Sequence, residues 1–427
     1  MHRIETQFAG RPLVIETGRL AKQAAGSVLV QYGETVVLAA VTVSPNISHL
    51  PFFPLTVEYR EKQYAAGKIP GGFLKREGRL SDDEILNCRI IDRSIRPLFP
   101  EGFRHETQVY VMVMSTDQEN ESDVLGVLAA SAALSLSQIP WEGPIAATRV
   151  GKVDGSWILN PTFQQLDYST MDLVVAGKAD SILMVEGGAL EVSEAEVVQG
   201  LKVAQVGIKE LIGHISDLVK QAGSKPTMAW EAPAKNADLI KAVEDMAIKA
   251  IGKAMSGKDK HGRAAAIAAV HTEVGLALAE QYPEGAKEIR TALEEVEYRS
   301  MRSQILDKGQ RIDGRDLDTV RPIMIEAGML PRVHGSALFQ RGETQALVAA
   351  TLGTADDEQR IESIESPVQS HKSFMLHYNF PPFCTGEAKP IRGTSRREIG
   401  HGALAERALH PLLPAMSDFP YTIRIVS

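Results

Sequence analysis

An internal repeat constrains the fold of this chain more than any other feature. Residues 11–20 read RPLVIETGRL and residues 321–330 read RPIMIEAGML, with six of ten positions identical. The match continues from GSVLVQYGETVVLAAVT at 26–42 to GSALFQRGETQALVAAT at 335–351, with ten identities in seventeen. Self-similarity at a nearly constant offset indicates a duplicated structural unit. We therefore expect two copies of one domain, copy one near the N-terminus and copy two near the C-terminus.

Each copy opens with a predicted β-hairpin, because apolar and polar residues alternate on both sides of a short Gly-Glu turn. Further along, RSIRPLFP at 93–100 corresponds to RALHPLLP at 407–414, and the strand ending at Ser115 corresponds to the one ending at Ser427. Copy one then continues with an apolar helix at 124–136, strands near 145–150 and across 171–187, and an amphipathic helix from about Ser193. Copy two has no such continuation, so roughly 100 residues would be missing from it if the copies are equivalent.

Between the copies, residues 235–306 are rich in Ala, Glu, Lys and Leu, which predicts helices. The resulting organisation has an α+β domain at 1–230, an all-α linker domain at 231–308 and the N-terminal part of a second α+β domain at 309–427. A chain ending at Ser427 should leave a strand of copy two without its later neighbours, exposing a sheet edge and an apolar face.

Composition limits the class of protein. The 44% hydrophobic and 23% charged fractions are those of an ordinary soluble protein. No apolar run is long enough to span a membrane, and MHRIETQFAG lacks the features of a signal peptide, so we expect a cytoplasmic protein without a membrane partner. The two cysteines, Cys88 and Cys384, fit no ligand spacing and are expected to be free thiols. A net charge of -8 argues against indiscriminate coating of nucleic acid, so any binding of RNA or phosphate must be local.

Copy one offers two basic clusters. Arg89, Arg93 and Arg96 fall on one face of a predicted helix. The alternative is a solvated stripe with ion pairs to Asp92 and Glu84. In the glycine-flanked loop GGFLKREGR at 71–79, an aromatic ring is interleaved with basic residues, a composition that can stack a base and bind its phosphates. The members of this loop cluster are Phe73, Lys75, Arg76 and Arg79. In the alternative reading, Phe73 only anchors the loop in the core.

Copy two concentrates Gly, Arg and His in IRGTSRREIGHGALAER at 391–407. The glycines allow backbone to approach an anion, and arginine binds phosphate in a bidentate manner. The candidates are Arg392, Arg396, Arg397, His401 and Arg407, and His401 could serve as a general acid, a general base or a phosphate ligand. A purely structural role for the cluster remains the alternative. Copy two lacks the paired carboxylates that hold a catalytic metal.

The duplicated hairpin, RIDGR at 311–315, FLKREGR, IIDRSIRPLFP, FMLHYNFPP and SRREIGHG occur in order. With these motifs the chain resembles the polynucleotide phosphorylase family over essentially its whole length. The resemblance implies two ribonuclease-PH-like units of the ribosomal protein S5 domain 2-like fold, the second incomplete, joined by an all-helical linker. It also implies phosphate-dependent 3′-to-5′ degradation of single-stranded RNA, with release of nucleoside diphosphates, in mRNA turnover. Inorganic phosphate, Mg²⁺, a homotrimer and partner proteins of an RNA-degradation complex are further implied.

By the same resemblance, Phe73, Lys75, Arg76 and Arg79 lie in the loop that threads RNA into the ring, and Arg89, Arg93 and Arg96 lie along the RNA path. Catalytic roles fall to His401, Arg396, Arg397 and Arg407, while His410 replaces the arginine that copy one has at Arg96.

The chain also departs from the family. The phosphate-binding serines and the DxDFK catalytic pattern would follow Ser427, and the KH and S1 RNA-binding modules are absent. Copy one cannot supply the missing groups, because Thr170 and Val174 replace the Asp and Lys beside Asp172, and the acidic TDQENESD would repel phosphate. Copy one therefore reads as an RNA-guiding, non-catalytic copy.

Three hypotheses follow. The chain is part of a longer phosphorolytic enzyme whose reading frame continues past Ser427, and alone it is expected to be inactive. Alternatively, it is a non-catalytic RNA-binding or scaffold protein. A hydrolytic exoribonuclease is disfavoured, since it needs acidic metal ligands that the sequence does not present.

Overall fold

The computed structural model describes residues 1–232, 234–257, 259–365, 370–391 and 393–427. Its internal contacts define two compact units. The first contains Met1–Glu231, Ile325–Phe339 and Ala346–Ser427, and the second contains Ala232–Met324 and Gln340–Gln345. All candidate site residues that the structure describes belong to the first unit.

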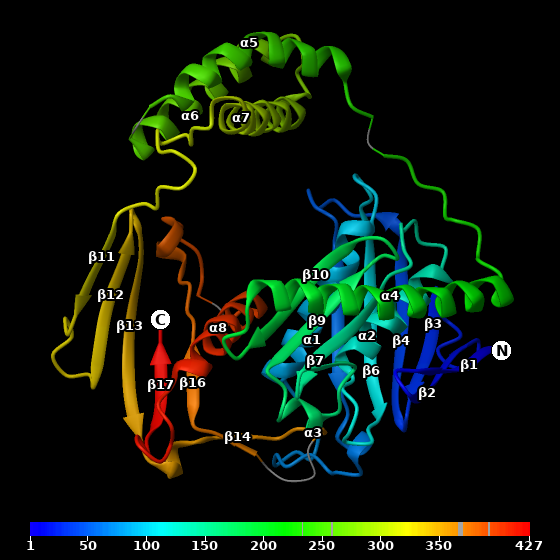
Figure 1. Cartoon of the computed structure of the whole chain (residues 1–427). Coiled ribbons are helices and arrows are strands. Elements are labelled where there is room, and N and C mark those ends of the chain that lie inside the picture. The colour runs from blue at the N-terminus through cyan, green and yellow to red at the C-terminus, as the bar shows by residue number, and fades with distance from the viewer. Residues whose placement is uncertain (233, 258, 366–369, 392) are drawn as a thin grey trace. The chain divides into compact units, whose positions relative to one another are not determined.

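The first sheet of copy one has six strands in the order β1-β2-β3-β4-β6-β5 (Figure 1). Burial alternates strictly along β3, as expected for a strand with one face on the core. The predicted hairpin is confirmed: β3 pairs with β4, and Gly33 takes a positive φ of 59° in the turn. The strands are β1 (His2–Phe8), β2 (Arg11–Thr17), β3 (Gly26–Tyr32), β4 (Thr35–Ile47), β5 (Leu55–Glu61) and β6 (His105–Ser115).

A second sheet, in the order β10-β9-β7-β8, completes copy one. Its strands are β7 (Ala146–Val153), β8 (Ser156–Leu159), β9 (Met171–Gly177) and β10 (Ile182–Ala189). The predicted apolar helix is α2 (Asp123–Ser135), which contacts β3 and β4 on one side and β7 on the other. It is buried on all its faces because it lies between two sheets.

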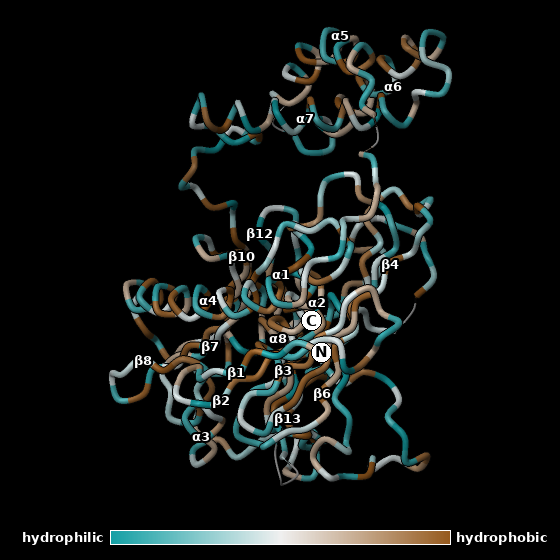
Figure 2. Tube along the Cα trace, turned by 90° about the vertical axis from the view of Figure 1, so that its right-hand side faces the viewer, coloured by the Kyte–Doolittle hydropathy of each residue, from teal (hydrophilic) through white to brown (hydrophobic). Residues whose placement is uncertain are grey.

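Three further helices complete copy one: α1 (Asp82–Ile95), the short α3 (Phe163–Leu166) and α4 (Glu194–Ala222). The predicted amphipathic helix is α4, which begins after the N-cap Ser193 and packs on β7 and β9. Figure 2 shows apolar and polar residues mixed along it. Of the two cysteines, Cys88 on α1 is buried and Cys384 is exposed, and both are free thiols.

Copy two builds a five-stranded sheet in the order β11-β12-β13-β17-β16, which reproduces β2-β3-β4-β6-β5 of copy one. Its strands are β11 (Ile323–Ala327), β12 (Gly335–Arg341), β13 (Thr344–Gly353), β16 (Phe374–His377) and β17 (Thr422–Val426). The short strands β14 (Gln359–Ile361) and β15 (Ser370–Lys372) pair with each other, and α8 (Arg396–Leu409) follows. The fold class is therefore confirmed for both copies.

The structure shows which strand forms the expected sheet edge of copy two. β17 pairs antiparallel with β13 and parallel with β16, so the last strand lies inside the sheet and β16 forms its edge. The expected apolar face is present, since Ile325 is 65% exposed and Leu347 is 46% exposed.

The second unit contains the predicted helices between the copies, α5 (Ala237–Met255), α6 (Lys260–Ala279) and α7 (Ala286–Lys308). They pack against one another around a core of their own that includes Leu239, Val243, Ile251, Leu278 and Leu293. Among the helices that the structure describes, none is both long enough and apolar enough to cross a membrane.

Candidate functional site

The repeat places two equivalent helices, α1 and α8, in direct contact. Ser81 caps α1 and Ser395 caps α8, each in a reciprocal capping box with a glutamate three residues later. Both helices have 14 residues and continue into a 3₁₀ turn. The arginine stripe of copy one lies on α1, and the Arg and His residues of copy two lie on α8. These two equivalent helices lie side by side.

Arg89 of α1 crosses α8 at Gly400. A Cβ at residue 400 would lie 2.3 Å from Nε of Arg89, so the glycine makes this close approach possible. The next residue of α8 is His401, whose ring packs edge-on against Tyr378, with centroids 5.3 Å apart. Burial, followed by the charges of Arg397 and Arg89, lowers the pKa of His401. The lowered pKa favours the neutral imidazole at pH 7, which can accept a proton as a general base.

A single carboxylate joins equivalent arginines of the two copies. Glu186 of β10 lies 2.5 Å from Nη1 of Arg93 through one oxygen and 3.5 Å from Nη2 of Arg407 through the other. Arg93 and Arg407 occupy corresponding positions in the repeat. Glu186 was not predicted from the sequence, because it lies on a strand far from both arginines in the chain.

Arg396 also connects the copies. Its guanidinium donates to the backbone oxygen of Val57 at 2.7 Å and to the carboxylate of Glu58 at 2.5 Å. Its neighbour Arg397 is exposed. Arg392 lies outside the described residues.

The third arginine of the α1 stripe has a local partner. Arg96 forms an ion pair with Asp92 at 2.6 Å and also donates to the backbone oxygens of Phe53 and Leu55. This contact matches the structural alternative for that residue. Glu84, the other acid proposed for such a stripe, lies instead beside Arg60. The three arginines of the predicted stripe therefore have different contacts: Arg89 lies at Gly400, Arg93 pairs with Glu186, and Arg96 pairs with Asp92.

The loop cluster projects into solvent. Phe73 is 97% exposed and Leu74 is 82% exposed, while Lys75 adopts a positive φ of 50°. Arg76 and Arg79 are exposed as well. The alternative in which Phe73 anchors the loop in the core is wrong, so this ring is available for stacking.

Beside the two helices lies a pocket of about 800 Å³. Residues of copy one and copy two both line it, among them Asp172, Gly188, His377, Arg407 and Arg424. Arg407 is thus the predicted site residue that reaches both this pocket and Glu186.

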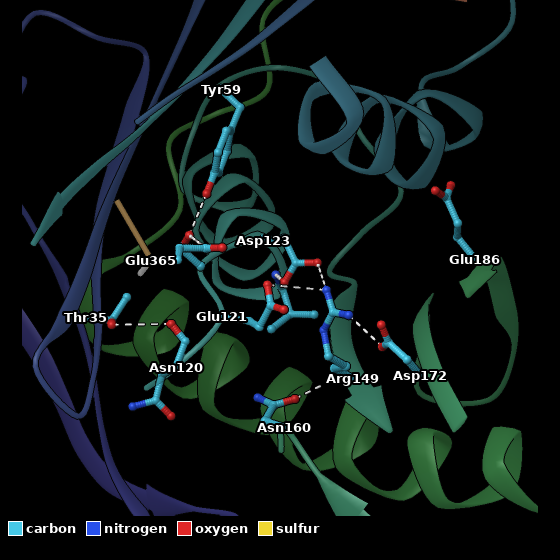
Figure 3. A network of polar contacts seen from close by, with 12 residues as sticks. Thr35, Tyr59, Asn120, Glu121, Asp123, Arg149, Asn160, Asp172, Glu186 and Glu365 are labelled. Carbon is cyan, nitrogen blue, oxygen red and sulfur yellow. Dashed lines mark hydrogen bonds and ion pairs between the residues drawn. The ribbon is translucent and has the colours of Figure 1, made fainter. Parts of the chain in front are cut away.

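The region of copy one that corresponds to the family's catalytic pattern contains an internal ion-pair network (Figure 3). Arg149 of β7 lies 2.7 Å from Asp123, 2.6 Å from Asp172 and 3.4 Å from Glu121. Burial alone would lower the pKa of Arg149, but the three carboxylates outweigh it and raise that pKa. The acidic loop after Ser115 therefore turns inward onto this arginine.

A second buried acid comes from copy two. The carboxyl of Glu365 accepts a hydrogen bond from Ser122 at 3.1 Å, and Ser122 also bonds to Tyr59 at 2.7 Å (Figure 3). Burial, followed by the charges of Glu61 and Asp123, raises the pKa of Glu365 to about 8. This carboxyl therefore keeps its proton at neutral pH.

The described residues do not fit the Mg²⁺ that the family resemblance implies. No group of three or more His, Cys, Asp or Glu side chains among them could hold a metal ion. Glu121, Asp123 and Asp172 converge, but the guanidinium of Arg149 already lies between them and pairs with all three.

Comparisons with known proteins cover every part of the chain. The model of the 3′ exoribonuclease family, domain 1, matches both copies, at residues 9–140 and 319–427. Domain 2 of that family matches residues 143–207, and the RNA binding domain of polyribonucleotide nucleotidyltransferase matches residues 238–316. The double match of domain 1 agrees with the repeat found in the sequence.

Curated relatives align along the whole chain. A polyribonucleotide nucleotidyltransferase of Gemmatimonas aurantiaca is 61% identical over 427 residues, covering 100% of this chain and 58% of the relative. Those of Heliobacterium modesticaldum and Thermus thermophilus are 49% and 48% identical, each with 100% of this chain and 60% of the relative covered. The chain thus spans less than two thirds of the length of these relatives.

Proposed function

This chain belongs to the 3′ exoribonuclease family, among the polyribonucleotide nucleotidyltransferases, and from that premise we propose that it forms part of a phosphorolytic exoribonuclease. The enzyme shortens single-stranded RNA from the 3′ end with inorganic phosphate and releases nucleoside diphosphates. The observation that carries the proposal is the match of the domain 1 model to both copies. In the cell, the proposed process is mRNA degradation in the cytoplasm.

The two copies have different roles in this proposal. The exposed ring of Phe73 stacks on a base, while Lys75, Arg76 and Arg79 neutralise backbone phosphates at the same loop. This loop belongs to copy one, whose Arg149 network leaves no unpaired cation for an incoming phosphate. Copy one therefore guides the RNA.

Copy two carries the groups proposed for the chemistry. Attack of phosphate on a phosphodiester brings two anions together, so fixed positive charges must lower the repulsion in the transition state. The exposed guanidinium of Arg397 and the pocket-lining Arg407 supply such charge, while Arg396 holds α8 on copy one. Neutral His401 beside Arg397 can move a proton.

Other features rest on the family resemblance. These are a homotrimer, a requirement for Mg²⁺ and partner proteins of an RNA-degradation complex. No group of three or more His, Cys, Asp or Glu side chains among the described residues could hold a metal ion, so Mg²⁺ stays an expectation for the protein in which this chain works.

Product analysis tests the proposal. The gene product that contains these 427 residues is incubated with an end-labelled oligo(A), with and without inorganic phosphate. We expect nucleoside diphosphates only when phosphate is present. Nucleoside monophosphates formed without phosphate would show hydrolysis and contradict the proposal.

A second candidate is a non-catalytic RNA-binding chain. This candidate is favoured by the network of copy one, in which carboxylates already bind Arg149, and by the absence of a DxDFK pattern from the 427 residues. Residues 1–427 alone should then bind oligo(A) in a salt-dependent manner without releasing any nucleoside diphosphate. Release by this chain alone would exclude that candidate.

A further inference from the structure

A short segment of copy two is packed into copy one. This segment, which we call the arm, comprises residues 362–365 and follows β14. Its Ile364 is 0% exposed and lies in the hydrophobic core that the strands and helices of copy one form. Among the described residues of that buried core, Ile364 is the one that copy two supplies. Such a side chain anchors the arm, because its removal from water stabilises the docked position.

Polar contacts hold the arm in the acidic loop 116–123 of copy one. The side-chain amide of Gln118 donates to the carbonyl oxygen of Ile364 at 3.1 Å, and Ser122 donates to the carboxyl of Glu365 at 3.1 Å (Figure 3). Gln118 has a positive φ of 59°, a backbone conformation that residues other than glycine rarely adopt. Such a conformation persists where surrounding contacts determine it, and the bond to the arm is one of these contacts.

The arm also reaches the base of the loop 71–79, which carries the loop cluster. Lys68, three residues before this loop, donates from Nζ to the carbonyl oxygen of Ser363 at 2.9 Å. The carboxylate of Glu362 lies against Gly71, where a Cβ would be 2.4 Å from Oε1. The arm therefore contacts the chain where the loop begins.

The opposite end of the loop is attached within copy one. Glu77 accepts a hydrogen bond from the backbone N–H of Gln63 at 3.1 Å, and Arg60 donates to the carbonyl oxygen of Gly78 at 3.2 Å. Between the two ends, Phe73 is 97% exposed, so packing in the core does not fix its ring. The position of the loop cluster therefore depends on the attachments at the two ends of the loop, and copy two provides one of them.

We propose that the arm is a positioning element for RNA: by docking residues 362–365 in copy one, copy two fixes the loop cluster in the place where it binds single-stranded RNA. The inference rests on the proposed function, since RNA is the ligand of the loop cluster. A loop that is already ordered binds more tightly, because binding does not have to order it first. Release of the arm therefore weakens RNA binding without removing any group proposed for the chemistry.

The test measures the dissociation constant for fluorescent oligo(A) of the gene product that contains these residues, without inorganic phosphate so that no phosphorolysis occurs. Ile364→Ala removes the anchor of the arm and should weaken binding about three- to tenfold, the cost of ordering one or two side chains. Ile15→Ala is the matched control, because Ile15 is also 0% exposed in the same core. It lies on β2, which β3, β4 and β6 separate from β5, and its replacement should not change the dissociation constant.

A double-variant cycle separates positioning of the loop from a general structural effect. In a chain that carries Phe73→Ala and Arg76→Ala, the loop has lost its stacking ring and one cation, so Ile364→Ala should weaken binding much less. In phosphorolysis of oligo(A), Ile364→Ala should raise KM and keep kcat, because the arm acts on binding alone.

Equal dissociation constants for the folded Ile364→Ala protein and the unaltered protein would overturn the inference. An undiminished effect of Ile364→Ala in the Phe73→Ala, Arg76→Ala chain would overturn it as well. Should Ile364→Ala not fold, Gln118→Met takes its place, since it removes the donor to the Ile364 carbonyl oxygen.

Failure of the proposed function gives a different result. The unaltered protein would then bind oligo(A) but release no nucleoside diphosphate when phosphate is added, and the comparison of RNA affinities among the variants would still decide the role of the arm. Absence of any oligo(A) binding by the unaltered protein would contradict the inference itself.

Discussion

The guanidinium of Arg396, the first residue of α8, lies 2.5 Å from the carboxylate of Glu58 on β5, so an arginine of copy two is bound to the first sheet of copy one. Replacement of Glu58 by Gln removes the charge but keeps the shape. We expect it to lower the free energy of unfolding by about 1 kcal/mol, measured by urea denaturation, because a charge-assisted bond becomes a neutral one. Arg396→Lys keeps the charge but loses the two guanidinium N–H groups that bond to Val57 and Glu58. It should lower the free energy of unfolding by a similar amount. A loss only in Arg396→Lys would mean that the bond to Val57 carries the contact.

Arg149 holds the degenerate site of copy one together. Arg149→Met leaves Asp123, Asp172 and Glu121 without their shared cation. Removing one partner of a buried ion pair costs about 3–5 kcal/mol in the free energy of unfolding. The exposed Arg3–Glu5 pair provides the control, since Arg3→Met should change stability by less than about 1 kcal/mol. A loss from Arg149→Met as small as that of the control would refute a stabilising role for the network.

Glu365 should make stability depend on pH. In the unfolded chain its carboxyl ionises near the usual glutamate pKa, whereas in the folded chain the pKa is about 8. The stabilisation is therefore complete below the unfolded pKa and is lost as pH rises toward 8. The groups around the Glu365 carboxyl are Ser122, which donates a hydrogen bond to it, and the acids Glu61 and Asp123, which raise its pKa.

The experiment compares urea midpoints at pH 6 and pH 8 for the unaltered chain and Glu365→Gln. The unaltered chain should lose about 1–2 kcal/mol more than the variant between these values. Equal losses in both chains would mean that Glu365 ionises in the folded protein as it does in water.

Gly400 permits the close approach of Arg89 and does not supply a special backbone conformation, because it lies within α8 without a positive φ. Alanine is ordinarily favoured over glycine in a helix by about 1 kcal/mol. Gly213→Ala on α4, where nothing lies within 4 Å of the new Cβ, should show that gain. Gly400→Ala should not show this gain in stability, because the new Cβ would displace the side chain of Arg89. An equal gain in both variants, measured by thermal unfolding, would show that Arg89 moves aside without cost.

The sequence predicted best those elements whose structure is decided by residues close together in the chain. The Gly-Glu turns involve residues close in the chain, and the repeat itself matched residues 93–100 with 407–414, at the ends of α1 and α8. A continuous apolar run likewise located α2, and hydrophobic periodicity located α4. These elements were predicted correctly because short-range chemistry decides them.

The missed residues are partners in long-range contacts. Glu186, Glu58 and Arg149 carry no local pattern, since an isolated charge in a strand reads as solvent-exposed until the sheets are packed. The sequence also did not identify the edge strand of copy two: strand order decides which strand is the edge, and β16 enters the sheet beyond β17 in parallel register. Sequence adjacency does not contain that information.

The division of labour between the copies is tested most directly by steady-state phosphorolysis of a long oligo(A) by the gene product that contains these residues. We expect Phe73→Ala and Arg76→Ala to raise KM for RNA about tenfold with kcat nearly unchanged, since stacking and phosphate contacts bind substrate and transition state alike. Arg397→Ala and His401→Ala should lower kcat at saturating RNA about 100-fold or more, because they act on the developing charge and the proton. The opposite pattern, with kcat lost in the copy one variants and kept in the copy two variants, would contradict the account.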